Sequence, residues 1–177
     1  MIFVSGQHDH VAGILAAWHS EQPGLDVSPV AIFGRISRIE RYKAAALHEV
    51  FRLHQLDAGE YDVLAALRRS GPSYRLTPTE LYRSVLVTSA TMTERLDRLQ
   101  RRDLIRRRPA ARDRRSVLVE LTPAGRTVID RAITALLKTE AALLEGLSPA
   151  DRSTLGRILG KLAALLEQEP DTTATRA

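Results

Sequence analysis

Six arginines, one proline and one aspartate occupy the ten positions of the segment RRRPAARDRR, residues 106–115. A guanidinium group keeps its charge at any physiological pH and matches phosphate oxygens with two parallel hydrogen bonds, so this segment has the chemistry to hold a polyanion. A solvated charge run is the alternative interpretation. The wider segment 95–115 carries ten arginines and three aspartates, a net charge of +7, whereas the other residues together carry −2. A local cationic excess on a near-neutral body indicates nucleic acid as the partner.

The composition excludes several other classes of protein. The chain has 177 residues, of which 44% are hydrophobic and 27% charged, which fits one domain or one protomer with a sizeable core. Cysteine is absent, which removes disulfides and thiol chemistry. The N-terminus lacks the features of a secretory signal and no apolar run reaches 18 residues, so we expect a cytoplasmic, nucleoid-associated protein.

No enzyme motif and no metal motif stands out in the sequence. A phosphate loop, a nucleophile elbow and a paired acid–base motif are all missing, so catalysis is not expected. The five histidines have no matching carboxylate cluster, so neither a metal site nor a cofactor is expected.

Four Ser/Thr-Pro pairs mark helix starts, because the hydroxyl can cap a helix and proline is tolerated at its first position. These pairs begin at Ser28, Thr77, Thr122 and Ser148. Together with the apolar periodicity they predict helices over 10–21, 29–56, 58–70, 78–85, 88–102, 123–145 and 149–169, and strands over 104–108 and 116–121. We therefore divide the chain into N-terminal helices (1–56), a DNA-binding domain (57–121), C-terminal dimerisation helices (122–170) and a disordered tail (171–177).

A short helix, a tight turn, a second helix and a two-stranded hairpin with a basic tip predict a winged helix-turn-helix, in a fold that is mainly α with a small β-hairpin wing. Thr88 is expected to cap the second helix, whose opening residues are small or hydroxylated and allow close approach to a groove. The expected DNA contacts on this helix are Thr88, Ser89, Ala90, Thr91, Thr93, Arg95 and Arg98. A surface helix with no binding role is the alternative.

The tip of the predicted wing consists of Arg112, Asp113, Arg114 and Arg115. Arginine inserted into a minor groove responds to its width and negative potential, so these arginines are expected to contact DNA. A carboxylate near phosphates is repelled, so Asp113 is expected to brace a neighbouring arginine as a bidentate partner. A solvated loop is the alternative.

Strand alternation separates Arg107 from its neighbours. It places Arg107 on the same face as Ile105, so Arg107 points toward the protein body if Ile105 packs inward. An inward guanidinium needs a carboxylate, and Asp62 is the candidate partner. The alternative is that Asp62 is solvent-exposed and favoured by the dipole of its own helix.

The stretch from Leu76 to Arg126 resembles the winged-helix core of the MarR family of bacterial transcription factors. The resemblance rests on Arg-Leu-Asp-Arg-Leu in the second helix, Asp-Arg-Arg-Ser in the wing and Leu-Thr-Pro-Ala-Gly-Arg at the start of the next helix, and flanking helices extend it over 28–168. It implies an obligate dimer that is built by the N- and C-terminal helices and binds a pseudo-palindromic operator.

A finer resemblance concerns the branch of this family that responds to urate. That branch carries a tryptophan on an extra N-terminal helix, an aspartate before the helix-turn-helix, and one arginine in each of the recognition helix and the first wing strand. The matching positions here are Trp18, Asp62, Arg95 and Arg107. The resemblance implies that they bind a small anionic ligand such as urate or a related purine. Trp18 as a core residue or interface anchor is the alternative.

The C-terminal helices carry too many leucine side chains for helices that lie alone on the protein surface. A partner subunit is the simplest place to bury these side chains, with a monomeric core as the alternative. We therefore expect a homodimeric, ligand-responsive regulator that represses transcription. A constitutive or architectural DNA-binding protein without an effector is the competing hypothesis.

Overall fold

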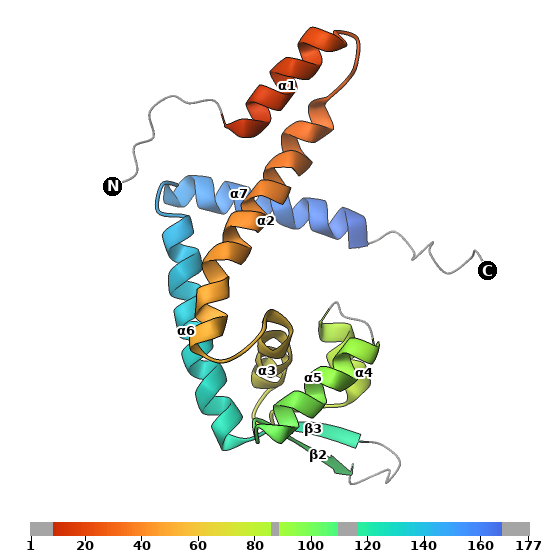
Figure 1. Cartoon of the computed structure of the whole chain (residues 1–177), viewed down its shortest axis with the longest axis vertical. Coiled ribbons are helices and arrows are strands. Elements are labelled where there is room, and N and C mark those ends of the chain that lie inside the picture. The colour runs from red at the N-terminus through yellow and green to blue at the C-terminus, as the bar shows by residue number, and fades with distance from the viewer. Residues whose placement is uncertain (1–8, 86–88, 110–116, 168–177) are drawn as a thin grey trace, which may run out of the picture. The chain divides into compact units, whose positions relative to one another are not determined.

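The computed structural model describes residues 9–85, 89–109 and 117–167, without the side chains of 89–91. Its elements are α1 (His10–Glu21), α2 (Ser28–Leu53), α3 (Ala58–Arg69), β1 (Arg75–Leu76), α4 (Pro78–Ser84), α5 (Ser89–Arg101), β2 (Ile105–Pro109), β3 (Val117–Leu121), α6 (Pro123–Leu143) and α7 (Pro149–Glu167). They are shown in Figure 1 and form two compact units, Met1–Leu136 and Leu137–Ala177. The expected tail, 171–177, lies outside the described residues.

The fold class is confirmed, but the sheet is larger than predicted. The described chain is mainly helical and contains a small antiparallel sheet in the strand order β1-β3-β2. β2 and β3 form the predicted hairpin, with Arg107 opposite Val119. The prediction of a two-stranded sheet missed β1, which pairs Arg75 with Glu120 and Leu76 with Val119. A strand of two residues is too short to produce a recognisable alternation.

Three of the four predicted helix caps are present. The hydroxyls of Thr77, Thr122 and Ser148 each accept a hydrogen bond from a backbone N–H in the first turn of the following helix. Ser28 does not act this way: α2 starts after Val27 without a side-chain cap, and the N–H of Ser28 donates to Asp26. A capping aspartate without proline, Asp57 of α3, was not predicted, although its partner lies at the usual spacing of three residues.

The core of the first unit lies between α3, α4, α5 and the sheet. α3 contributes Val63, Leu64 and Leu67, which are fully buried. Leu81 of α4 and Leu99 of α5 pack into the same cluster, as do Ile105 and Val119 from the facing strands β2 and β3. This arrangement fixes α4 and α5 against the wing strands through apolar burial, the main favourable term in folding.

The start of α6 lies unusually close to the start of β2. The Thr122 hydroxyl donates to the Asp103 carbonyl at 2.6 Å, and the Thr122 N–H donates to the Leu104 carbonyl at 3.1 Å. A Cβ on Gly125 would lie 2.0 Å from the Leu104 carbonyl oxygen, so only glycine permits this approach. The Leu-Thr-Pro-Ala-Gly-Arg motif is therefore the point where α6 docks on the wing domain.

α1 and α2 form a hairpin (Figure 1). Val11 of α1 is buried and lies against Gly34 of α2. The Asp9 carboxylate caps α1 and pairs with Arg35 of α2 at 2.8 Å. Further along, α2 meets α6 in a small apolar cluster of Leu47, Val50 and Leu136.

The second unit contains the end of α6 and the whole of α7. Ser148 and Asp151 cap α7, and Arg152 donates to the carbonyls of Leu144 and Leu147. No residue of α7 is buried in this chain, and five of its large apolar side chains are exposed: Leu155, Ile158, Leu159, Leu165 and Leu166. Among the described helices, none combines the length and the apolar character needed to cross a membrane.

Candidate nucleic-acid interface

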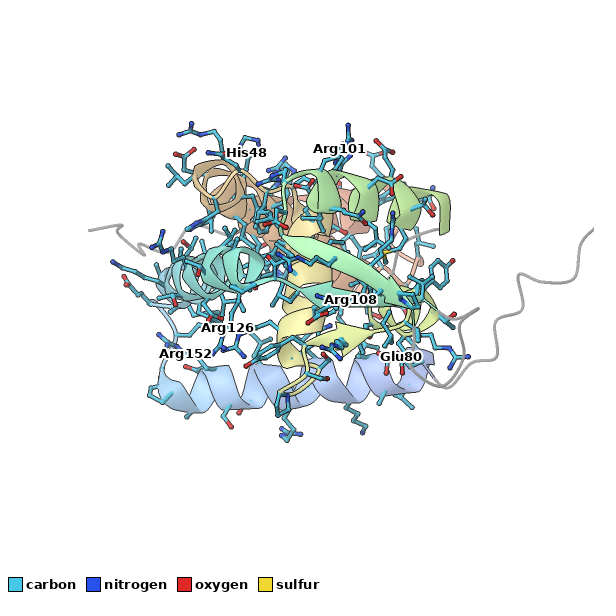
Figure 2. All side chains as sticks on the ribbon, turned by 90° about the horizontal axis from the view of Figure 1, so that it is seen from below. His48, Glu80, Arg101, Arg108, Arg126 and Arg152 are labelled. Atoms are coloured by element: carbon cyan, nitrogen blue, oxygen red, sulfur yellow. The ribbon has the colours of Figure 1, made fainter. Side chains whose placement is uncertain are left out.

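α5 has one apolar face and one polar face. Met92, Leu96 and Leu99 are buried, as the predicted apolar stripe requires. The opposite face exposes Thr93, Glu94, Asp97, Gln100 and Arg101. Figure 2 shows Arg101 projecting away from α5. This exposed face is the part of α5 that a DNA groove could reach.

Several residues predicted to contact DNA are described by their backbone alone or lie outside the described residues. Ser89, Ala90 and Thr91 form the first turn of α5. Thr93 is exposed on the same helix. Thr88 lies outside the described residues, as does the whole predicted wing tip of Arg112, Asp113, Arg114 and Arg115, and these contacts stay predictions.

Arg98 has partners within the protein that were not expected. Its guanidinium donates to Asp57 and to Glu60 of α3, the latter at 3.0 Å, and to Glu94 one turn earlier on α5 at 3.1 Å. These carboxylates favour the charged form, and the hydrogen bond to Glu60 is the largest cause of the raised pKa of Arg98. Arg98 therefore ties α5 to α3, and a role in contacting DNA stays a prediction.

Arg95 also turns toward α3. Its guanidinium lies on the backbone of Gly59, where a Cβ would approach Cζ to 2.1 Å. Its Nη1 atom is buried and meets no hydrogen-bond acceptor among the described residues. A buried donor without a partner costs free energy of about 1–3 kcal/mol, so this nitrogen is a ready partner for an incoming oxygen atom.

Arg107 faces inward as predicted, but its predicted partner is wrong. Ile105 is fully buried and Arg107 lies on the same face of β2, between the exposed Arg106 and Arg108. Arg107 Nη1 donates to Asp97 Oδ1 of α5 at 2.6 Å, not to Asp62. Asp97 precedes Arg107 by only ten residues, and the turn after α5 returns the chain along the same helix.

Much of the positive charge in the basic segment is neutralised locally. Arg106 lies 3.6 Å from Asp103, and Arg108 lies 2.9 Å from Glu120. Arg102 pairs with Glu60. Arg101, by contrast, is exposed and makes no ion pair within the described part of the chain. It was not among the predicted contacts, although its spacing of four residues from Asp97 and eight from Thr93 places it on the exposed face of α5.

Asp62 lines a pocket of about 590 Å³ between α2, α3 and Leu136 of α6. Lys43, His48 and Arg52 supply positive or ionisable groups, and Phe51 and Tyr61 supply rings 5.3 Å apart. Although part of Asp62 is exposed, burial of its carboxyl raises its pKa, against the opposing attraction of Arg69, Arg95 and Lys43. The pocket therefore combines aromatic surface with groups that recognise a charged or hydrogen-bonding ligand.

The four predicted ligand residues are not gathered in one place. Asp62 lines the pocket just described, and Arg95 acts on it electrostatically. Arg107 lines a second pocket of about 440 Å³ with Tyr82, Met92 and other residues of α4, α5 and β3. Trp18 is 42% exposed on α1 and lines neither pocket. Among the described residues, no group of three or more His, Asp or Glu side chains is arranged to hold a metal ion.

Comparison with known proteins places this architecture in one family. The model of the MarR family matches residues 54–116. The transcriptional regulator PecS of Dickeya dadantii is 36% identical over 86% of this chain and 92% of its own length. Among solved structures, BpsR of Bordetella bronchiseptica, whose DNA binding is regulated by 6-hydroxynicotinic acid, is 26% identical, with a TM-score of 0.66 over 75% of this chain and 92% of its own. A variant of Escherichia coli MarR bound to operator DNA is 25% identical, with a TM-score of 0.67 over 77% of this chain and 95% of its own.

The family match begins at the end of α2 and spans α3, α4, α5 and the wing strand β2, the elements that form the interface described above. The match to PecS covers 86% of the chain and so extends well beyond the residues that the family model matches. This chain belongs to the MarR family of DNA-binding transcriptional regulators.

Proposed function

We propose that this regulator is a repressor that binds a pseudo-palindromic operator with α5 in the major groove and the wing in the adjacent minor groove. The polar face of α5, with Thr93 and Arg101 exposed opposite the buried apolar stripe, carries the proposal. Two copies related by a twofold axis would place their recognition helices in half-sites about one helical turn apart. We expect the protein to act on the nucleoid in the cytoplasm.

The working unit in this proposal is a homodimer. The exposed leucines and isoleucine of α7 support it, since a helix with no buried residue gains its stability from a surface that covers its apolar side. α2 adds exposed Ile32, Phe33 and Ile39. Size-exclusion chromatography with light scattering is expected to give twice the chain mass of 19.6 kDa.

The proposed effector is a small, flat anionic ligand such as urate or a related purine, which releases the protein from DNA. The pocket at Asp62 supports a ligand of this kind, because Phe51 and Tyr61 offer aromatic surface while Lys43 and His48 can meet negative oxygen atoms. BpsR responds to 6-hydroxynicotinic acid, which is likewise a flat heteroaromatic acid. Asp62 and Arg95 are the proposed contacts at this pocket, and Trp18 and Arg107 remain proposed ligand residues from the finer resemblance.

The decisive experiment is an operator titration at fixed salt, with and without saturating urate, xanthine and nicotinate-type acids. Binding linkage requires the operator to weaken the ligand by the same factor by which the ligand weakens the operator. Because Trp18 is the only tryptophan of the chain, its fluorescence gives a second, independent signal of binding near α1. Unchanged operator affinity at saturating concentrations of every ligand would refute the proposed effector class.

The same titration separates a repressor from a constitutive or architectural DNA-binding protein. An architectural protein binds random duplex nearly as well as operator and shows a steep salt dependence with either. A repressor is expected to prefer its operator by about a thousandfold or more. Competition with random duplex at one salt concentration measures this ratio directly.

A further inference from the structure

Two arginines of α5 and the arginine directly after it contact the start of α3. Arg95 and Arg98 lie on α5 and Arg102 is the first residue after its end, so the three follow each other at spacings of three and four residues. Arg95 rests on Gly59, Arg98 donates to Asp57 and Glu60, and Arg102 donates to Glu60. The C-terminal half of the recognition helix and the residue after it are thus attached to the start of α3.

Glu60 is the centre of this attachment. It is only 5% exposed, and both of its carboxylate oxygens are occupied. Oε1 accepts from Arg98 Nε at 3.0 Å, while Oε2 accepts from Arg102 Nη1 at 3.2 Å and from the Asp57 backbone N–H at 3.1 Å. A buried carboxylate that loses such partners pays a large desolvation penalty, so the fold favours the arrangement of α5 that satisfies all three.

Two points of attachment fix a helix more tightly than one. Arg98 lies on the last turn of α5 and Arg102 directly after it, four residues further on, which corresponds to about 6 Å at the rise of a helix. Rotating α5 about its axis would carry both guanidinium groups away from Glu60, and sliding it along α3 would break at least one contact. We propose that Glu60 is a positioning residue for operator recognition: it contacts no DNA but sets the rotation and axial position of α5.

This inference rests on the proposed role of α5 as the recognition helix, and its test follows from the difference between positioning and contact. A residue that contacts phosphate supports binding to any duplex and contributes to the salt dependence. A residue that positions the recognition helix affects only binding that depends on aligned base contacts. Its loss should therefore lower the preference for operator over random duplex.

The first variant is Glu60→Gln, which keeps the size of the side chain but removes its charge and one acceptor oxygen. We expect its operator affinity to fall about tenfold or more, a loss comparable to one mismatched base pair. Affinity for random duplex should stay within about twofold, and the salt slope should stay unchanged because no phosphate contact is lost. Combining Glu60→Gln with Arg102→Gln should cost less than the sum of the single losses, since both remove the same contact.

The matched control is Glu80→Gln. Glu80 occupies the same position in the capping box of α4, but it is exposed and makes no ion pair to the arginines of α5 among the described residues. It should lower stability through the cap while keeping the preference for operator. Circular dichroism well below the unfolding transition verifies that each variant is folded.

An unchanged operator preference in folded Glu60→Gln would overturn the inference, as would equal losses on both duplexes or a reduced salt slope. The role of α5 is tested separately with Thr93→Val and Arg101→Gln. If neither changes operator affinity, the proposed function of α5 fails. If they do and Glu60→Gln does not, only the role of Glu60 fails.

Discussion

Three glycines give a graded test of how closely the elements of this fold approach one another. A Cβ on Gly125 would lie 2.0 Å from the Leu104 carbonyl oxygen, a backbone atom held in place by the Thr122 N–H. A Cβ on Gly59 would lie 2.1 Å from Arg95 Cζ, near the end of a flexible side chain. A Cβ on Gly13 of α1 would meet no atom within 4 Å. The methyl group of alanine would therefore contact backbone at Gly125, a side chain at Gly59 and no atom at Gly13.

The expected changes in stability follow from these surroundings. In a helix, alanine is favoured over glycine by about 0.5–1 kcal/mol, so Gly13→Ala should stabilise the protein by that amount. In Gly59→Ala the Arg95 guanidinium must retreat by about 1.4 Å to reach ordinary carbon contact, which should roughly cancel the gain. In Gly125→Ala the first turn of α6 must separate from β2, at a cost of about 1–3 kcal/mol or more.

Thermal unfolding at equal protein concentration measures this series. For a chain of this length, 1 kcal/mol corresponds to about 2–4 °C in Tm, so the expected cost of Gly125→Ala should lower Tm by about 2–12 °C. Gly59→Ala should stay within about 4 °C of the parent protein, and Gly13→Ala should match or exceed it. The reasoning is refuted if Gly125→Ala proves as stable as Gly59→Ala, because the position of the clashing atom would then not decide the cost.

Three further predictions concern single side chains. Burial raises the folded pKa of Asp62 above its unfolded value of about 3.9, so ionisation of this group opposes folding once the pH exceeds that value. Asp62→Asn should therefore raise Tm at pH 7, with the difference from the parent disappearing below about pH 4; a gain that persists in acid would contradict this cause. Thr122→Ala removes the cap of α6 and should cost about 1 kcal/mol, or about 2–4 °C in Tm, measured by the same melting curves. Arg107→Gln should blunt the response to ligand more than operator binding, and Arg115→Gln should do the reverse in the same titrations; equal effects of each substitution on both readouts would contradict the division.

The sequence predicted the helices well because several local signals agreed. The hydroxyl–proline pairs at Thr77, Thr122 and Ser148 gave starts that match the structure, and the apolar spacing gave the buried faces. Strand alternation was enough to predict that Arg107 points inward. These features depend on neighbours in the chain, so one sequence contains them.

The partners of the arginines could not be predicted in the same way. Asp62 and Asp97 both carry carboxylates, and the sequence does not show which of them lies beside Arg107. The packing of β2 against α5 brings Arg107 to Asp97. The net charge of segment 95–115 was also misleading as a measure of the cationic surface. Glu60 and Glu120, which neutralise several of its arginines, lie outside that segment, 35 residues before its start and five residues after its end.

The first turn of α3 connects the two proposed activities of the protein. Asp57 lines the pocket at Asp62 and also accepts from Arg98 of α5. A ligand whose ring N–H groups donate to Asp57 or Asp62 would draw that carboxylate toward the pocket. It would thereby weaken the contact with Arg98 on the other side of the same turn, without touching the DNA-facing side of α5. Conversely, operator DNA that holds α5 in place favours the arrangement of α3 seen here and so disfavours the ligand. In this mechanism the ligand and the operator favour different arrangements of the first turn of α3, so each weakens the binding of the other by the same factor.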